Sequence, residues 1–318
     1  MTPLQGTISS SIESLTSATD ISLSFNELGG KIPRSLGNLC NLKEIDFSCN
    51  KLSQEIFELL ESLSRCVSNG LEILDLTEAH ISSHLTNELI GQFINLVELS
   101  LGSTLVSSQI PEAIGNLSSL RILDLATNQF NGTLPQSLGQ LSKLESLYIA
   151  SNKFNGVVSE VHFANLTRLI ELHASQNQLE NRLTLEESHN WIPPFQLYQL
   201  GLRSWNLGPK FPSWLYSQKR LWYLDISNTN VSDVVPPLFW NMSSQFKYLN
   251  LSLNQMYREV LNIQMVFFPF GAMIDMSSNR FRGPLPFISS NVNILNLSNN
   301  LLSGSISHFL CCQMNISK

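Results

Sequence analysis

A single pattern recurs at intervals of 21–29 residues along almost the whole chain, and it limits the possible folds more than any other feature. Its clearest copy, residues 120–143, reads LRILDLATNQFNGTLPQSLGQLSK. Leu120, Leu123 and Leu125 follow the apolar alternation of a strand, and a wider apolar spacing follows Asn128. The first apolar positions of twelve copies are Ala18, Leu42, Leu71, Leu96, Leu120, Leu144, Leu169, Leu197, Leu221, Phe246, Gly271 and Val292.

An LxxLxL pattern with a period of about 20 to 29 residues is typical of leucine-rich repeats. Each copy predicts one short strand, and stacked copies form one parallel sheet. The segment after the strand carries an apolar residue followed by Pro, as at Ile32–Pro33 and Leu134–Pro135, which favours extended segments and 3₁₀ turns over long helices. The sequence therefore predicts an α/β leucine-rich-repeat solenoid with a curved parallel sheet on its concave face and 3₁₀ turns and extended segments on its convex face.

The ninth residue of each copy is the second regular feature. An Asn there can pair its amide with buried backbone groups where the chain turns out of the strand. Eight copies have this residue, at Asn26, Asn50, Asn128, Asn152, Asn177, Asn254, Asn279 and Asn300. The other four have Ala79, Thr104, Trp205 and Thr229.

The copies predict one repeat array over residues 1–318 in place of two globular domains. Residues 1–17 fit a partial repeat, residues 55–66 have the apolar spacing of an amphipathic helix, and residues 181–196 are expected to form a loop insertion. Neither end has a polar closing unit of the kind that solenoids need. We therefore expect the array to be truncated at both ends.

Composition and motifs exclude several classes of function. A formal charge of −6 and a pI near 5.5 give no basic footprint for nucleic acid. The chain shows no signal peptide and no apolar segment of transmembrane length, so no membrane contact by this segment is expected. His80 and His84 lack further ligands at metal-binding distance, and no catalytic motif is present. We therefore predict a protein that is not an enzyme and has neither a metal nor a cofactor.

The third and fifth residues of each copy should point outward from the concave face, because strand side chains alternate. Copies six to ten bring aromatic residues there, and such residues recur as interface hot spots. A peptide or protein ligand is predicted across these copies. The candidate ligand-binding residues are Tyr148, Glu171, His173, Tyr198, Arg203, Trp222, Tyr223 and Tyr248. The alternative, that these side chains only decorate the repeat, stays open at this point.

Glycosylation signals of the form Asn-x-Ser/Thr predict glycans if the chain is secreted. They occur at Asn116, Asn131, Asn165, Asn230, Asn241, Asn250, Asn296 and Asn315. Asn250 and Asn296 occupy outward strand positions, so glycans there would block ligand and move the binding centre toward earlier copies.

Two cysteines occupy similar places in neighbouring copies: Cys40 two residues before Leu42, and Cys66 five residues before Leu71. Strands stack about 4.8 Å apart, within the Cα separation that a disulfide tolerates. A Cys40–Cys66 disulfide is therefore predicted in an oxidising compartment.

The segments LGGKIPRSLGNL and FNGTLPQSLGQL resemble the plant-specific class of extracellular leucine-rich repeats. Residues 190–255, NWIPPFQLYQLGLRSWNLGPKFPSWLYSQKRLWYLDISNTNVSDVVPPLFWNMSSQFKYLNLSLNQ, look like the corresponding region of plant receptor-like proteins, the surface receptors without a kinase domain. The resemblance implies an extracellular position at the plasma membrane and a co-receptor kinase as partner. Family members usually have Cys where this chain has Trp205.

These observations favour non-enzymatic recognition of a protein or peptide by a receptor-like protein ectodomain, in defence or developmental signalling. One alternative is a secreted inhibitor of microbial wall-degrading enzymes, similar to polygalacturonase-inhibiting proteins, which share the repeat. A truncated, non-functional gene copy is the other alternative.

Overall fold

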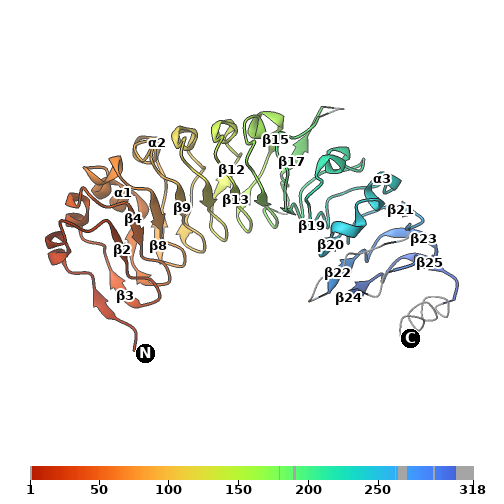
Figure 1. The fold of residues 1–318 in the computed structure, drawn as a ribbon, viewed down its shortest axis with the longest axis horizontal. Coiled ribbons are helices and arrows are strands. Elements are labelled where there is room, and N and C mark those ends of the chain that lie inside the picture. The colour runs from red at the N-terminus through yellow and green to blue at the C-terminus, as the bar shows by residue number, and fades with distance from the viewer. Residues whose placement is uncertain are drawn as a thin grey trace. The chain divides into compact units, whose positions relative to one another are not determined.

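The computed structural model describes residues 2–178, 180–188, 191–261, 263, 271–288 and 291–305. The chain divides into two compact units, residues 1–169 and 170–318, each built from copies of the repeat (Figure 1). Most copies contain one strand of a parallel sheet, a turn, and a returning segment of short strands, 3₁₀ turns or a short helix. Within each unit of Figure 1, the sheet strands lie along one side and the helical turns along the other.

The main sheet of residues 1–169 is parallel and in regular register. Its strands are β2 (Asp20–Ser22), β4 (Glu44–Asp46), β7 (Ile73–Asp75), β9 (Glu98–Ser100), β11 (Ile122–Asp124) and β13 (Ser146–Tyr148). Each begins at the third residue of its copy, so the predicted strand positions are confirmed. We call the face that carries the third and fifth residues the open face.

The returning segments of residues 1–169 are short. Their strands are β1 (Gln5–Thr7), β3 (Glu27–Gly30), β5 (Lys51–Leu52), β6 (Gln54–Glu55), β8 (Ile81–Ser83), β10 (Leu105–Val106), β12 (Asn131–Gly132), β14 (Lys153–Phe154) and β15 (Val157–Ser159). The 3₁₀ turns are η1 (Ser10–Ser14), η2 (Arg34–Asn38), η3 (Val67–Asn69), η4 (Glu112–Asn116), η5 (Gln136–Gln140) and η6 (Glu160–Phe163). The α-helices are α1 (Ile56–Leu63) and α2 (Asn87–Ile90). Helix α1 lies in the range 55–66, and it buries Ile56, Leu59, Leu60 and Leu63.

The main sheet of residues 170–318 is also parallel. Its strands are β16 (Glu171–His173), β18 (Gln199–Gly201), β19 (Tyr223–Asp225), β20 (Tyr248–Asn250), β22 (Ala272–Asp275) and β24 (Val292–Asn296). The returning segments contain β17 (Thr184–Glu186), η7 (Ser213–Ser217), α3 (Pro237–Trp240), η8 (Ser243–Gln245), β21 (Tyr257–Arg258), β23 (Arg280–Pro284) and β25 (Leu301–Ser303). Strand β17 lies inside the range 181–196, which is thus not a pure loop.

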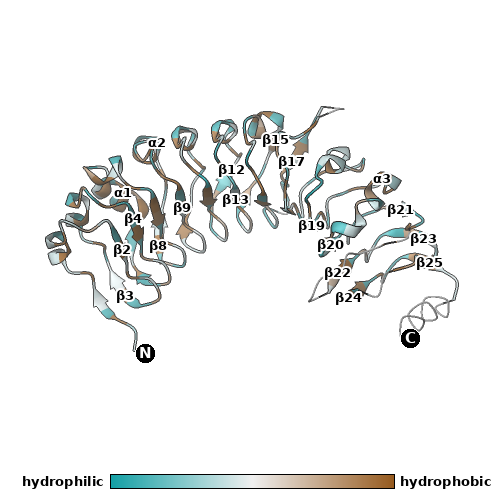
Figure 2. Cartoon of the chain, in the orientation of Figure 1, coloured by the Kyte–Doolittle hydropathy of each residue, from teal (hydrophilic) through white to brown (hydrophobic). Residues whose placement is uncertain are grey.

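The core follows directly from the LxxLxL pattern. In the copy that begins at Leu120, the side chains of Leu120, Leu123 and Leu125 have no exposed surface. Figure 2 shows hydrophobic colour recurring in the strands of successive copies within each unit. Since each copy can bury its apolar face only against its neighbours, the core is continuous within a unit.

The ninth-place Asn links each copy to the preceding one, as its chemistry suggests. Asn152 is 7% exposed, its Nδ2 donates to the carbonyl oxygen of Leu125 at 2.8 Å, and its Oδ1 accepts from the backbone N–H of Phe130 at 2.9 Å. Where Trp205 replaces Asn, its indole N–H donates to the carbonyl oxygen of Ala174 at 2.8 Å. Trp205 therefore keeps one of the bonds that Asn makes elsewhere.

The residue before the ninth place is left-handed in every copy, which the sequence pattern did not indicate. Its φ lies between 52° and 59° in most copies and reaches 69° at Ser204. These residues are Phe25, Cys49, Glu78, Ser103, Thr127, Ser151, Gln176, Ser204, Asn228, Leu253, Ser278 and Asn299. The tight turn out of each strand needs this conformation, although non-glycine residues adopt it at some cost.

Close packing of neighbouring copies also explains one recurrent glycine. A Cβ added to Gly139 would collide with the backbone carbonyl oxygen of Val161 in the next copy. The backbone of one copy thus lies where a side chain of the other would be. The φ of Gly139 is not positive, so this position does not need the conformational freedom of glycine. It needs glycine because a side chain would collide with the next copy.

Cys40 and Cys66 form a disulfide with a Cα separation of 4.9 Å. The bond joins the end of η2 to the start of η3, in neighbouring copies. Cys49 is a free cysteine with intermediate exposure.

Candidate functional site

The main sheet of residues 170–318 aligns its outward side chains in two rows. The third residues form one row: Glu171, Gln199, Tyr223, Tyr248, Met273 and Ile294. The fifth residues form the other: His173, Gly201, Asp225, Asn250, Asp275 and Asn296. Consecutive strands are about 4.8 Å apart, so neighbours within a row are at contact distance.

The centre of the open face is a stack of aromatic rings. The rings of Tyr223 and Tyr248 are nearly parallel, with centroids 4.4 Å apart and planes at 10°. The ring of His173 approaches Tyr223 to 5.7 Å. Gly201 lies between His173 and Asp225 in the second row, and an added Cβ there would meet the Ser175 Oγ at 3.0 Å and the His173 Nδ1 at 3.6 Å.

A third set of side chains precedes each strand and extends this face. Trp222 packs edge-on against Tyr223 at 6.2 Å, and the Lys247 ammonium lies 5.6 Å from the indole centre. The Arg220 guanidinium lies 6.0 Å from the Tyr198 ring and donates to its hydroxyl at 3.3 Å. These contacts are consistent with cation–π attraction, which also restricts the side chains.

Beside the tyrosine stack the surface is hollowed by about 310 Å³. The lining residues are Trp222, Tyr223, Lys247, Tyr248, Gly271, Ala272, Met273, Asn293 and Ile294. Aromatic and aliphatic side chains thus form the walls, and one ammonium group supplies positive charge. Such a site can hold an apolar side chain of a ligand beside a carboxylate or carbonyl group.

The rings of this face are uncharged near neutral pH. Burial raises the pKa of Tyr223 to about 12 and also raises the pKa of Tyr248. Burial lowers the pKa of His173, although the nearby carboxylate of Glu171 has the opposite effect. The stack therefore presents neutral contact area at physiological pH.

The second row corrects the expectation that every fifth residue is exposed. Asp225 and Asn250 are only 6% and 8% exposed. The carboxylate of Asp225 accepts hydrogen bonds from the backbone and hydroxyl of Ser227, and the amide oxygen of Asn250 does the same with Ser252. These polar residues hold the turn that follows the strand, and the first row is the more exposed of the two.

Three fifth-place aspartates on the open face of residues 1–169, Asp46, Asp75 and Asp124, have the same turn-holding role. Asp124 accepts from the backbone N–H of Ala126 at 2.9 Å. Burial raises the pKa of Asp124, and the charge of Asp75 adds to this effect. Burial alone would also raise the pKa of Asp46, but hydrogen bonds led by that of Ser48 lower it overall. These carboxylates thus have a structural role in the turn.

The structure brings together four of the predicted ligand-binding residues: His173, Trp222, Tyr223 and Tyr248. Tyr198 contacts Arg220, and Glu171 accepts a hydrogen bond from Gln199 at 2.8 Å. The positive charge of Arg203 opposes the rise in the pKa of Tyr248. Tyr148 is half-buried on β13, in the other unit, and its part in binding stays a prediction.

Sequence reasoning missed Lys247 and Met273 as members of the site. Met273 is a third residue, but only aromatic and charged positions had been selected. Lys247 is the second residue of its copy, as are Tyr198 and Trp222. The second place is aromatic in the two preceding copies, at Tyr198 and Trp222, and this pattern could have indicated that Lys247 belongs to the same surface.

The glycosylation signals differ in accessibility. Asn116, Asn131, Asn165, Asn230 and Asn241 are exposed. Asn250 is buried and its Nδ2 donates to the Tyr248 hydroxyl, so its amide is less accessible than the amides of these five, and a glycan there stays a prediction. Asn296 is half-buried and donates to Asp275, and Asn315 lies outside the described residues.

Within the described ranges, no group of three or more His, Cys, Asp or Glu side chains could hold a metal ion. No helix in the described part of the chain combines the length and apolar character needed to span a bilayer.

Family models match much of the chain. A leucine-rich repeat region matches residues 53–187, and the single leucine-rich repeat matches residues 17–39, 41–63 and 220–242. Together these matches include copies from both units.

Curated proteins with similar sequences are plant receptor-like proteins. Receptor-like protein EIX2 of Solanum lycopersicum is 42% identical over 150 residues, which cover 47% of this chain and 14% of that protein. Receptor-like protein EIX1 of the same plant is 41% identical over 135 residues, which cover 42% of this chain and 13% of that protein. The matched region is thus a small part of these relatives.

Solved plant receptors share the fold. The plant peptide hormone receptor RGFR1, in complex with RGF2, aligns with a TM-score of 0.79 and 26% identity, over 97% of this chain and 51% of that one. The ectodomain of the Arabidopsis receptor kinase HAESA aligns with a TM-score of 0.55 and 22% identity, over 96% of this chain and 65% of that one, and so supports the fold alone. From its repeats, its fold and the family models, the chain belongs to the leucine-rich-repeat proteins, and the curated proteins it resembles are plant receptor-like proteins.

Proposed function

We propose that residues 170–318 recognise a peptide or protein ligand on the open face of their main sheet. The observation that carries this proposal is the Tyr223–Tyr248 stack, with its centroid separation of 4.4 Å, beside the hollow of about 310 Å³. Pre-stacked rings lose little side-chain entropy on binding, and tyrosine and tryptophan dominate many interface hot spots.

The chemistry of the hollow favours a peptide over a sugar or a nucleotide. Met273 and Ile294 continue the row beside Tyr248 and provide aliphatic surface, and Lys247 provides one cation. An apolar ligand side chain would fill the hollow, and a neighbouring carboxylate would lie near Lys247. RGFR1, a structural neighbour, was solved in complex with RGF2, which makes a peptide ligand a reasonable expectation for this chain.

The wider role rests on the relatives. By analogy with receptor-like proteins, we place the chain on the extracellular side of the plasma membrane, with a co-receptor kinase as a partner in defence or developmental signalling. Glu171, Tyr198 and Arg203 would extend the contact along the sheet of residues 170–318. A contact by Tyr148, on β13 in the other unit, stays a separate prediction.

A peptide selection tests the proposal. The purified chain would be used to select binders from a phage library of random dodecapeptides, and the enriched peptides would then be offered to variants. We expect the Tyr223→Ala/Tyr248→Ala double variant to lose most binding, because both rings contribute to one contact surface.

The matched control is Phe25→Ala, which removes an aromatic ring that is 79% exposed in a turn. It should leave binding unchanged. If the enriched peptides bind the double variant as well as the parent chain, or if Phe25→Ala has the same effect, the open face of residues 170–318 is not the ligand site.

A further inference from the structure

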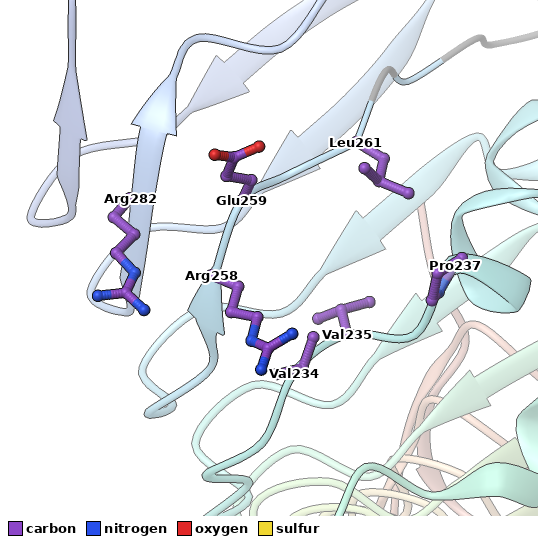
Figure 3. Close-up of a pocket in the computed structure, with 7 residues that line it drawn as sticks. All are labelled: Val234, Val235, Pro237, Arg258, Glu259, Leu261 and Arg282. Carbon is purple, nitrogen blue, oxygen red and sulfur yellow. The ribbon is translucent and has the colours of Figure 1, made fainter.

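A second hollow, of about 440 Å³, lies in residues 170–318, and Figure 3 shows the residues that line it. Val234, Val235, Pro237 and Leu261 give it an aliphatic lining. The charged residues Arg258, Glu259 and Arg282 complete it. The hollow shares no lining residue with the hollow on the open face.

The arginines around this hollow have no carboxylate partner. Among the described residues, no ion pair or side-chain hydrogen bond involves Arg258, Arg280 or Arg282. The residues outside the described ranges include no Asp or Glu that could supply one. On the corresponding strands of residues 1–169, by contrast, Lys51 pairs with Glu27 at 3.3 Å.

The three arginines lie on two paired strands, β21 and β23. In the parallel register of β21 and β23, Tyr257 lies opposite Arg280 and Arg258 opposite Phe281. Phe281 is buried, so Arg280 and Arg282 on either side of it point outward together. The whole chain has a net charge of −6, so its overall composition does not explain a local group of positive charges.

Glu259 is the only acidic residue in the lining, and it does not neutralise the arginines. In Figure 3 the guanidinium of Arg258 points toward Val234, whereas the carboxylate of Glu259 points away from it. The Glu259 side chain instead lies over Gly283, where an added Cβ would meet its Cγ at 2.7 Å. The two arginines are therefore available to an anionic ligand.

We propose that this hollow binds an acidic segment of a partner protein. One aliphatic side chain of the segment would enter the Val234, Val235 and Leu261 lining, and flanking carboxylates would pair with Arg258 and Arg282. Guanidinium groups suit carboxylates because they offer paired donors in a fixed plane. A sugar is less suited, since the lining is aliphatic and has no aromatic ring for a sugar face to stack on.

A labelled peptide tests this proposal directly. The probe is a fluorescein-labelled peptide of sequence GEELEEG, and its matched control is GQQLQQG. Fluorescence anisotropy with the whole chain should show binding of the acidic probe, weakening as salt is raised, and little binding of the neutral one.

Charge variants locate the site. Arg258→Gln/Arg282→Gln should weaken binding by about tenfold or more, because two charge-assisted contacts are lost. Lys210→Gln/Lys219→Gln removes the same charge from exposed positions outside the hollow and should change binding by less than about twofold. Glu259→Gln should strengthen binding, because it removes a like charge beside the ligand carboxylates.

Equal weakening by the two double variants would mean a non-specific charge effect and would overturn the proposal. So would the absence of binding by GEELEEG, or equal binding of GQQLQQG. Preferential binding of oligogalacturonate over the acidic peptide would show that the partner is a polysaccharide. Circular dichroism melts of each variant, which alters only exposed side chains, confirm that the fold is kept.

Discussion

Replacing Asn152 by Ala removes the polar link between two neighbouring copies. The Asn152 side chain accepts from the Phe130 N–H at 2.9 Å and donates to the Leu125 carbonyl at 2.8 Å. It also contacts the carbonyl oxygens of Ile149 and Ala150 at 3.4 and 3.2 Å. No water can replace these bonds easily, since the side chain is 7% exposed.

The expected loss of stability follows from the backbone groups that Asn152→Ala leaves without a partner. A buried N–H without a partner costs about 1–3 kcal/mol, and the loss of a bond to the Leu125 carbonyl adds about 1 kcal/mol. We therefore expect Asn152→Ala to lower the free energy of unfolding by about 2–4 kcal/mol. Asn116→Ala is the matched control: Asn116 is exposed, so its substitution should change stability by less than about 0.5 kcal/mol.

Guanidinium unfolding followed by far-UV circular dichroism measures both values. The protein should be produced in a bacterial periplasm, where the disulfide can form and no N-glycan is attached to Asn116. A loss of less than about 1 kcal/mol for Asn152→Ala, or a loss equal to that of Asn116→Ala, would refute the view that the ninth-place Asn stabilises the stack.

Three further perturbations follow from the same geometry. Replacing Cys40 and Cys66 by Ser opens a loop with a sequence separation of 26, and should cost about 3.5 kcal/mol in guanidinium unfolding; an unchanged midpoint would contradict this. Burial raises the pKa of Asp124 in the folded state, so stability is lost as pH rises through that pKa. Asp124→Asn should thus raise the melting temperature at pH 7 and make no difference well below pH 4, and a pH-independent effect would count against it. Gly139→Ala should cost more than about 2 kcal/mol because of the collision with Val161, whereas Ser142→Ala should not.

The repeat made most of the strand positions predictable. In a pattern such as that of Leu120, Leu123 and Leu125, the same three places are buried in nearly every copy, so one copy describes the others. The ninth-place Asn was interpreted correctly for the same reason. Strand β17 was not foreseen, because the range 181–196 departs from the repeat and offers no alternation to read.

The proposed binding surface was only partly predictable. Tyr223 and Tyr248 follow from alternation, since both are third residues of their copies. The burial of Asn250 depends on Ser252, whose hydroxyl ties the Asn250 amide to the turn. That local bond is not part of the strand pattern, so the pattern alone does not indicate that Asn250 is buried.

The arginine-lined hollow was missed for a different reason. Arg258 and Arg282 lie on strands that follow the ninth place, where the copies vary in length and share no fixed outward position. Their significance comes from the absence of carboxylate partners among the described residues. Only the spatial arrangement reveals that absence.

Isothermal titration of a selected peptide into the chain tests the central claim most directly. The parent chain and Phe25→Ala should bind with the same affinity. The Tyr223→Ala/Tyr248→Ala variant should lose at least about 2 kcal/mol of binding free energy, the size expected for a hot spot. Equal affinity in all three proteins would contradict the claim that the open face of residues 170–318 is the ligand-binding surface.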